Sequence, residues 1–429
     1  MADSGQSISA RQQFGGFSST APGGLSVLER TVLYAGVVMV PYANLRLPQI
    51  FFTISDLFFC LSVLILLISG RIPNRPLDRA TPTWLLAFTL LFVGMMAGSL
   101  LRGSPERGLI VTAQYLFAYL LLMVVLVRRD PDEAHRLAAI FLASIILIDI
   151  HGIYTFYAVG YVPGEGKGVV TGGLRLATVL RNPNLAASIN ALTTPILLYF
   201  WSSGRLKFYI ALPAIAIVLV TVVLTSSNSG LILTTISMTV FTTFIMTTRL
   251  LFRMAIALAV VAVTFVTFGG TDLLPKTFHK RVLSALSSGD TSEAGTLISR
   301  TALMEEAIGV ISEERILIVG LGADQFRERS VQEAPVHNLY LLLWVEGGLL
   351  AVVGWVMFSG VGILLWFAIR RGGGDKYALA AVATTVVVFL AIALFNPHMY
   401  ARYWVTPVFL CFGLGLTQLR GGNRLKYRT

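Results

Sequence analysis

Residues 338–369 read NLYLLLWVEGGLLAVVGWVMFSGVGILLWFAI and contain a single charged residue, Glu346. The apolar residues are continuous and do not alternate with polar ones, so the stretch predicts an α-helix in a membrane and not a β-strand. A helix of about 20 residues is enough to cross a bilayer. The extra length, with Gly347-Gly348 inside it, predicts that this helix is tilted or broken.

The rest of the chain has the same apolar character. It has 429 residues, 55% of them hydrophobic and 13% charged, and its mean hydropathy is +0.75. A soluble domain of this length builds its core with fewer apolar residues, so the excess indicates a bilayer as solvent. Apolar segments occur at about residues 31–45, 52–69, 84–101, 109–127, 137–159, 185–202, 208–225, 230–248, 254–269, 338–369, 378–395 and 403–419. The sequence therefore predicts an all-α membrane protein of about 12 transmembrane helices.

Basic residues predict the orientation of these helices. The net charge is +11, and with both termini in the cytoplasm each inner loop carries at least two Lys or Arg, as the positive-inside rule requires. No basic and aromatic motif typical of RNA or DNA binding occurs, so nucleic acid is not an expected partner. The predicted organisation is a disordered cytoplasmic tail at 1–30, helices within 31–269, an outer loop at 270–337, helices within 338–419 and a cytoplasmic tail at 420–429.

The outer loop is too long for a simple connection, and we expect it to be partly helical. From Thr296 to Glu314 apolar residues recur at the spacing of one face of an amphipathic helix. These residues are Leu297, Met304, Ile308 and Ile311. Arg300 falls on the same face, where an arginine either snorkels to the membrane interface or meets an anion.

His337 stands where this loop meets the long apolar helix. A histidine gains or loses a proton near neutral pH, so His337 is the candidate general base for a hydroxyl acceptor. The alternatives are that it caps the helix or lies at the lipid headgroups. Glu346 follows at membrane depth, where a carboxylate marks a functional or structural site. Asp149 and His151 share an earlier helix, and we interpret them as structural.

Several arginines lie on the predicted outer side. Arg175 and Arg181 belong to a glycine-rich stretch that turns at Asn182-Pro183 into a helix, and two arginines at a membrane surface can hold phosphates. Lipid-headgroup anchoring is the alternative for both, and ordinary interfacial anchoring is the alternative for Arg402 in the last outer loop.

Two further features receive structural interpretations. His398 is interpreted as an interfacial residue rather than a catalyst. Arg102 and Arg107 bracket a tight turn that we interpret as solvated and paired with Glu106.

Other motifs limit the chemistry. The sequence has no Walker motif, no Gly-x-Gly-x-x-Gly unit and no cluster with metal-ligand spacing. Asp130-Pro131-Asp132 precedes a helix on the inner side, where helix capping explains it better than a metal site. Cys60 and Cys411 lie inside apolar runs and indicate neither a disulfide nor a metal. We expect no cofactor and no metal, and a lipid-linked sugar donor in place of a nucleotide sugar.

In order along the chain, several segments resemble the O-antigen ligase and polymerase superfamily of bacterial membrane glycosyltransferases. They are Arg181-Asn182-Pro183-Asn184, the Ser-rich turn Thr225-Ser226-Ser227-Asn228-Ser229-Gly230, Arg281-Val282-Leu283-Ser284, Ser299-Arg300-Thr301, Val319-Gly320-Leu321-Gly322-Ala323-Asp324, and His337-Asn338-Leu339-Tyr340 with Trp344 and Glu346-Gly347. Two positions depart from the family pattern. Asn228-Ser229 replaces an arginine at the Ser-rich turn, and Met304 replaces a tryptophan.

The resemblance implies metal-independent, inverting transfer of a glycan from undecaprenyl diphosphate to an acceptor hydroxyl in the periplasm. It implies a bacterial inner-membrane location and a periplasmic site on loop 270–337. His337 is then the base, supported by Asn338, Tyr340 and Glu346, and the diphosphate ligands are Arg300, Arg181, Arg175, Arg281 and Arg402. We expect ligation to lipid A-core, with a polymerase that uses a glycan acceptor as the alternative. A transporter or flippase is the alternative from another class.

Overall fold

The computed structural model describes residues 24–47, 51–127, 130–163, 168–246, 274–283 and 297–425, with isolated positions between 252 and 267. These residues fold mainly as helices, joined by two short antiparallel hairpins. The long helices are α1 (Gly24–Met39), α2 (Ile54–Ile68), α3 (Thr81–Leu101), α4 (Pro105–Leu116), α6 (Pro131–Tyr154), α7 (Pro183–Ser202), α8 (Phe208–Leu224), α9 (Asn228–Ile245), α13 (Leu297–Glu313), α15 (Leu339–Arg371), α16 (Lys376–Ala393) and α17 (Arg402–Leu425).

Shorter elements complete the described chain. They are β1 (Arg46–Leu47), β2 (Phe52–Thr53), η1 (Asp78–Ala80), η2 (Phe117–Leu121), α5 (Leu122–Leu126), η3 (Thr155–Val159), β3 (Val170–Thr171), β4 (Arg175–Leu176), η4 (Thr178–Leu180), α11 (Lys276–Phe278), η6 (His279–Leu283) and α14 (Gln325–Arg329).

The helical membrane class predicted from the sequence is confirmed. Among the described residues, seven helices are long and apolar enough to cross a membrane, and α2 and α8 are shorter apolar helices. The number of about 12 transmembrane helices stays a prediction. The predicted segment 254–269 lies outside the residues that the structure describes continuously.

The first and last helices extend beyond the apolar segments counted in the sequence. Helix α1 begins at Gly24, inside the segment assigned to the disordered tail. Glu29 in this part of α1 is buried and accepts a hydrogen bond of 2.6 Å from the Ser62 hydroxyl of α2, so packing on α2 extends the helix. At the other end, α17 continues to Leu425, beyond the predicted boundary at residue 419.

The predicted break in the long helix is confirmed. Gly348 has φ 69° and ψ −172° inside α15, a conformation that favours glycine. The segment before α14 donates hydrogen bonds to backbone carbonyls of α15 just before this break. The amides of Leu321 and Gly322 donate to the carbonyls of Val345 (2.9 Å) and Glu346 (2.8 Å). A Cβ at Gly348 would lie 2.0 Å from the Ile318 carbonyl oxygen, so this close contact also requires glycine.

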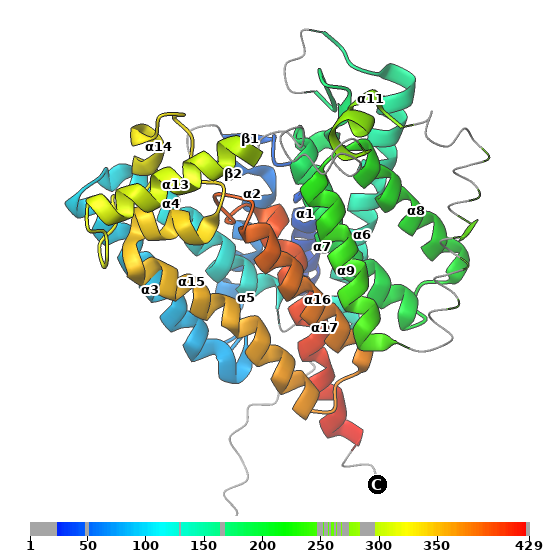
Figure 1. Cartoon of the computed structure of the whole chain (residues 1–429). Helices are drawn as coiled ribbons and strands as arrows, with labels where there is room; N and C mark the ends of the chain where they lie inside the picture. Colours follow the sequence, from blue (N-terminus) through cyan, green and yellow to red (C-terminus); the bar gives the residue numbers. More distant parts are fainter. Residues whose placement is uncertain are drawn as a thin grey trace, which may run out of the picture.

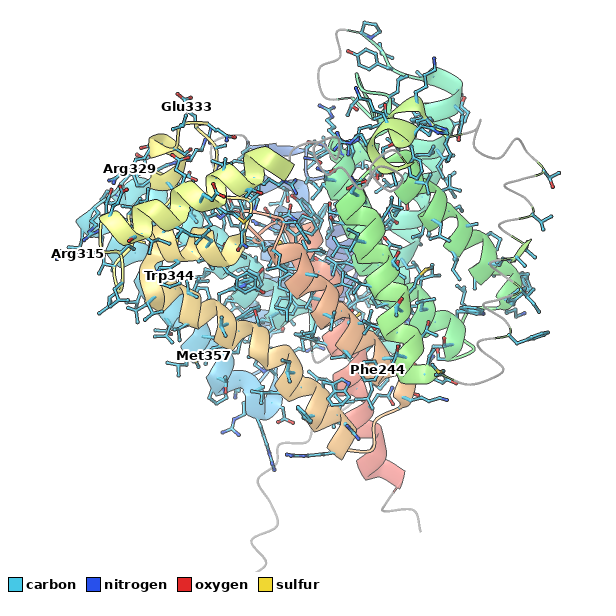
Figure 2. All side chains as sticks on the ribbon, in the orientation of Figure 1. Phe244, Arg315, Arg329, Glu333, Trp344 and Met357 are labelled. Atoms are coloured by element: carbon cyan, nitrogen blue, oxygen red, sulfur yellow. The ribbon has the colours of Figure 1, made fainter. Side chains whose placement is uncertain are left out.

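Helix α13 confirms the predicted amphipathic helix but corrects its buried face. Leu303 and Ala307 are buried against α15, whereas Ile308 is 58% exposed. The indole of Trp344 on α15 donates to the Ile316 carbonyl (3.1 Å) just beyond α13, and Figure 2 shows Trp344 where α15 passes beneath α13. The buried face of α13 is therefore rotated from the predicted one, because Leu303, and not Ile308, faces the apolar cluster above α15.

The elements that carry the predicted site gather at one end of the helix bundle. Figure 1 shows α11, α13, α14 and the β1–β2 hairpin at this end, and the last helix, α17, ending at the opposite one. Residues far apart in the sequence therefore meet at the mouth of the bundle. We refer to this end as the loop-bearing end.

Candidate active site

A cavity of about 360 Å³ opens at the loop-bearing end of the bundle. Its wall comes from the segments that precede or begin several helices, which is why residues widely separated in sequence share it. The lining residues used below are Asn182, Asn184 and Ser188 of α7 and its cap, Ser229 of α9, Arg300 of α13, His337, His398 and Arg402. Aromatic residues Phe51, Phe395, Tyr400, Tyr403 and Trp404 line it as well.

His337 is half-buried and faces this cavity without capping α15. The side chain of the next residue, Asn338, accepts the hydrogen bond of 3.2 Å from the Leu341 amide and is the N-cap. Burial and the positive charge of Arg300 lower the pKa of His337 below its ordinary value of 6.5. The imidazole is therefore neutral near neutral pH, the form that accepts a proton.

Three of the predicted arginines form a chain of like charges that leads to His337. Burial lowers the pKa of Arg300, and the nearby positive charge of Arg281 lowers it further. The same two causes lower the pKa of Arg175 to about 10. Two contacts hold this arrangement. The Thr277 hydroxyl of α11 donates to the Gly173 carbonyl, and the Asn228 amide donates to the Arg281 carbonyl (3.2 Å). We call Arg175, Arg281 and Arg300 the arginine cluster.

Within the described part of the chain, no carboxylate forms a salt bridge with the arginine cluster. The Nε atoms of Arg281 and Arg300 are buried and have no hydrogen-bond partner among the described residues. Buried cationic donors without partners are costly. The arrangement therefore fits an anion that accepts several N–H bonds at once, as a phosphate does.

Arg175 reaches the Ser-rich turn that lacks the family's arginine. Its Nε donates to the Thr225 carbonyl (2.8 Å) and its Nη2 donates to the Asn184 side chain (2.8 Å), and Asn184 lines the cavity. A guanidinium from β4 thus stands beside this turn, although Asn228 and Ser229 occupy the turn itself.

Arg402 and Arg181 differ from the arginine cluster. Arg402 lines the cavity, but Asp56 of α2 already pairs with it through two contacts, Nε to Oδ1 (2.6 Å) and Nη2 to Oδ2 (2.8 Å). Its charge is therefore neutralised inside the protein. Arg181 is exposed, adopts φ 55° and is not among the residues that line the cavity.

The predicted supporting residues hold the helix that carries His337. Asn338 caps α15, and Tyr340 packs against the main apolar core. Glu346 is fully buried beside the helix break, where its carboxylate faces the backbone amides of Asp324 and Phe326. It lies inside α15 and is not among the residues that line the cavity.

A second polar group at the cavity was not predicted. Arg107 pairs with Asp324 (2.6 Å), which corrects the predicted pairing with Glu106. The other Asp324 oxygen lies 4.0 Å from Nε2 of His398. Burial lowers the pKa of His398 to about 4, and Asp324 acts against that shift. Asp324 follows the turn Gly320-Leu321-Gly322, and this turn is the sequence feature from which a polar group here could have been predicted.

Asp130 is confirmed as a helix cap. Its side chain accepts a hydrogen bond of 2.9 Å from the Glu133 amide at the start of α6. Among the described residues, no group of three or more His, Cys, Asp or Glu side chains could hold a metal ion.

The segment that matches a known protein family contains several of the residues that line the cavity. Residues 213–356, which include α9, α13, His337 and the broken part of α15, match the family model described as O-antigen ligase. The match covers about a third of the chain. No curated protein matches the chain. With the apolar helices, this match supports a multi-pass membrane protein related to glycosyltransferases of the O-antigen ligase and polymerase type.

Proposed function

We propose that the chain transfers a glycan from undecaprenyl diphosphate to an acceptor hydroxyl, and that the acceptor is lipid A-core in the periplasm. One observation carries the proposal: a neutral, half-buried His337 shares a cavity with Arg300 of a cationic cluster with which none of the described carboxylates is paired. This pairing of a base with an anion site is what transfer from a diphosphate donor requires. We place the cavity on the periplasmic side, with both termini in the cytoplasm.

The arginine cluster would bind the diphosphate. As the bond between the anomeric carbon and the diphosphate oxygen breaks, negative charge develops on the leaving group. The guanidinium groups stabilise that charge, so the mechanism needs no metal ion. Arg402, neutralised by Asp56, would position the cavity wall instead, and exposed Arg181 would meet the donor or lipid headgroups at the rim.

His337 would take the proton of the acceptor hydroxyl. The acceptor oxygen then attacks the anomeric carbon from the face opposite the diphosphate, and a single displacement of this kind inverts the anomeric configuration. The neutral amide and hydroxyl side chains on the cavity wall, Asn182, Asn184, Ser188 and Ser229, are suitable hydrogen-bond partners for sugar hydroxyls.

A deletion strain tests the choice of acceptor. If the protein is a ligase, long polymer accumulates on the undecaprenyl carrier and lipid A-core stays bare. A single repeat unit on lipid A-core would identify a polymerase instead. Purified protein with lipid-linked glycan and acceptor tests the reaction itself, and movement of the lipid without a glycosidic product would identify a transporter.

Arg300→Ala should lower transfer by about 2–4 kcal/mol of transition-state stabilisation and weaken donor binding. Arg300→Lys should recover only part of both, because an ammonium cannot form the paired contacts of a guanidinium. Donor binding and single-turnover rates measure the two effects. The matched control is Arg329→Ala, since Arg329 is an exposed arginine of the same loop that pairs with Glu314. Equal losses in both alanine variants would contradict the role of Arg300.

The pH dependence of glycosyl transfer should show whether the charge of Arg300 affects the pKa of His337. A base acts when neutral, so kcat/KM should fall as the pH drops through the lowered pKa of His337. Arg300→Gln removes the positive charge that helps to lower this pKa, so the acid limb should move to higher pH. Arg300→Lys keeps the charge and should keep the limb in place. An acid limb that is the same in all three proteins would separate Arg300 from the base.

A further inference from the structure

Three helices below the cavity wall enclose a polar cluster at membrane depth. Asp149 of α6, Asn190 of α7 and Thr221 of α8 are 1%, 0% and 0% exposed. The side-chain nitrogen of Asn190 donates to Oδ1 of Asp149 (3.2 Å) and to the Ala186 carbonyl (3.0 Å). The Thr221 hydroxyl faces the same carboxyl group. We call Asp149, Asn190 and Thr221 the oxygen cluster.

One oxygen of each side chain in this cluster is buried without a hydrogen-bond partner in the part of the chain that the structure describes. These atoms are Oδ2 of Asp149, Oδ1 of Asn190 and Oγ1 of Thr221. The orientation of the Asn190 amide is decided by its neighbours, because a flipped amide would place its oxygen against two acceptors. The described residues supply no cationic side chain to Asp149 within ion-pair distance.

We propose that the oxygen cluster binds a dehydrated sodium ion. Carboxylate, amide and hydroxyl oxygens are the ligands that hard cations prefer. A single carboxylate balances a single positive charge, which favours a monovalent ion over a divalent one. Oxygen ligands at about 2.3–2.6 Å from an ion of this size surround it without bonding one another, and that accounts for three neighbouring oxygens that do not form hydrogen bonds.

The Glu346 carboxylate is a useful contrast within the same protein. It is also fully buried in a membrane helix, but it faces the backbone amides of Asp324 and Phe326. Backbone amides can only donate to a carboxylate, whereas Asn190 and Thr221 beside Asp149 each carry an oxygen as well as a donor. The difference in surroundings therefore assigns the cation to Asp149 and not to Glu346.

A bound ion would stabilise the wall of the cavity from below. Asn190 lies on α7 together with Asn184 and Ser188, which line the cavity. Thr221 lies one turn before Thr225, whose carbonyl accepts the Arg175 guanidinium. Cross-linking α6, α7 and α8 through one ion would hold these groups in place.

The test uses the full chain purified in detergent, with its thermal midpoint measured at constant pH and ionic strength while sodium chloride replaces choline chloride. We expect the midpoint to rise with sodium and to saturate. Potassium should act only at higher concentrations. Asp149→Asn should abolish the response, whereas Glu346→Gln should keep it.

Thr221→Val serves as a second variant in case Asp149→Asn does not fold, because it keeps the side-chain size and removes one ligand. It should move the titration to higher sodium concentrations. A midpoint that ignores sodium in the unmodified protein would overturn the proposal, as would an unchanged titration in Thr221→Val. A response to pH alone, lost in Asp149→Asn, would show that a proton occupies the site. Since the readout is stability, failure here is independent of glycosyl transfer.

Discussion

His337→Ala should lower the rate of glycosyl transfer by about 10²–10⁴-fold while donor binding survives. The reason is that the imidazole acts on the acceptor hydroxyl, whereas the arginine cluster meets the diphosphate. The variant should also lose the pH dependence that follows the histidine. Single-turnover transfer and binding of the lipid-linked donor, measured on the same preparation, separate the two effects.

The helix that carries His337 provides the control. Asn338, and not His337, accepts the capping bond of α15, so Asn338→Ala should lower stability by about 1 kcal/mol. His337→Ala should leave the thermal midpoint nearly unchanged. Full transfer activity in His337→Ala at normal expression would remove the histidine from the mechanism, and our central proposal would be wrong.

Asp56→Ala should destabilise the protein by about 3–5 kcal/mol, because it leaves a buried arginine charge without its partner. The Arg402 side chain is 5% exposed and that of Asp56 is 0% exposed. Arg402 also donates to Gln114 (2.7 Å) and stacks over the ring of Phe117 at 4.3 Å. Asp56 further accepts the Thr53 amide (2.8 Å) in the capping box of α2, so its loss affects two elements.

The thermal midpoint in detergent measures this effect. The double variant Asp56→Ala with Arg402→Met should recover much of the loss, because it removes the stranded charge. Glu314→Ala is the matched control, since its pair with Arg329 is exposed on both sides and an exposed pair contributes at most about 1 kcal/mol. A loss in Asp56→Ala no larger than in Glu314→Ala would contradict the structural role of the buried pair.

Much of the fold was predictable because local sequence determines it. Continuous apolar runs form helices in lipid, since only a helix satisfies its own backbone there. Gly347-Gly348 predicted the break in α15, and Asp130 predicted a helix cap. The failures lie where packing decides. Glu29 extends α1 through its bond to Ser62, and the buried face of α13 follows Leu303 rather than Ile308.

The candidate site was predictable in its chemistry but not in its partners. His337 and the arginines were visible as residue types at a membrane boundary, and the match at residues 213–356 supports the family they suggested. Their pairing was not visible. Arg402 is neutralised by Asp56, and Arg107 is neutralised by Asp324, each across a long interval of sequence.

By itself, the sequence determined that this chain is a helical membrane protein, where its long helix breaks, and which residue types can move a proton or hold a phosphate. Only the tertiary structure decided which cations keep a free charge at the cavity and which are neutralised inside the protein. The physical reason is that apolar periodicity and capping act within a few residues, whereas burial and charge pairing depend on how distant helices pack.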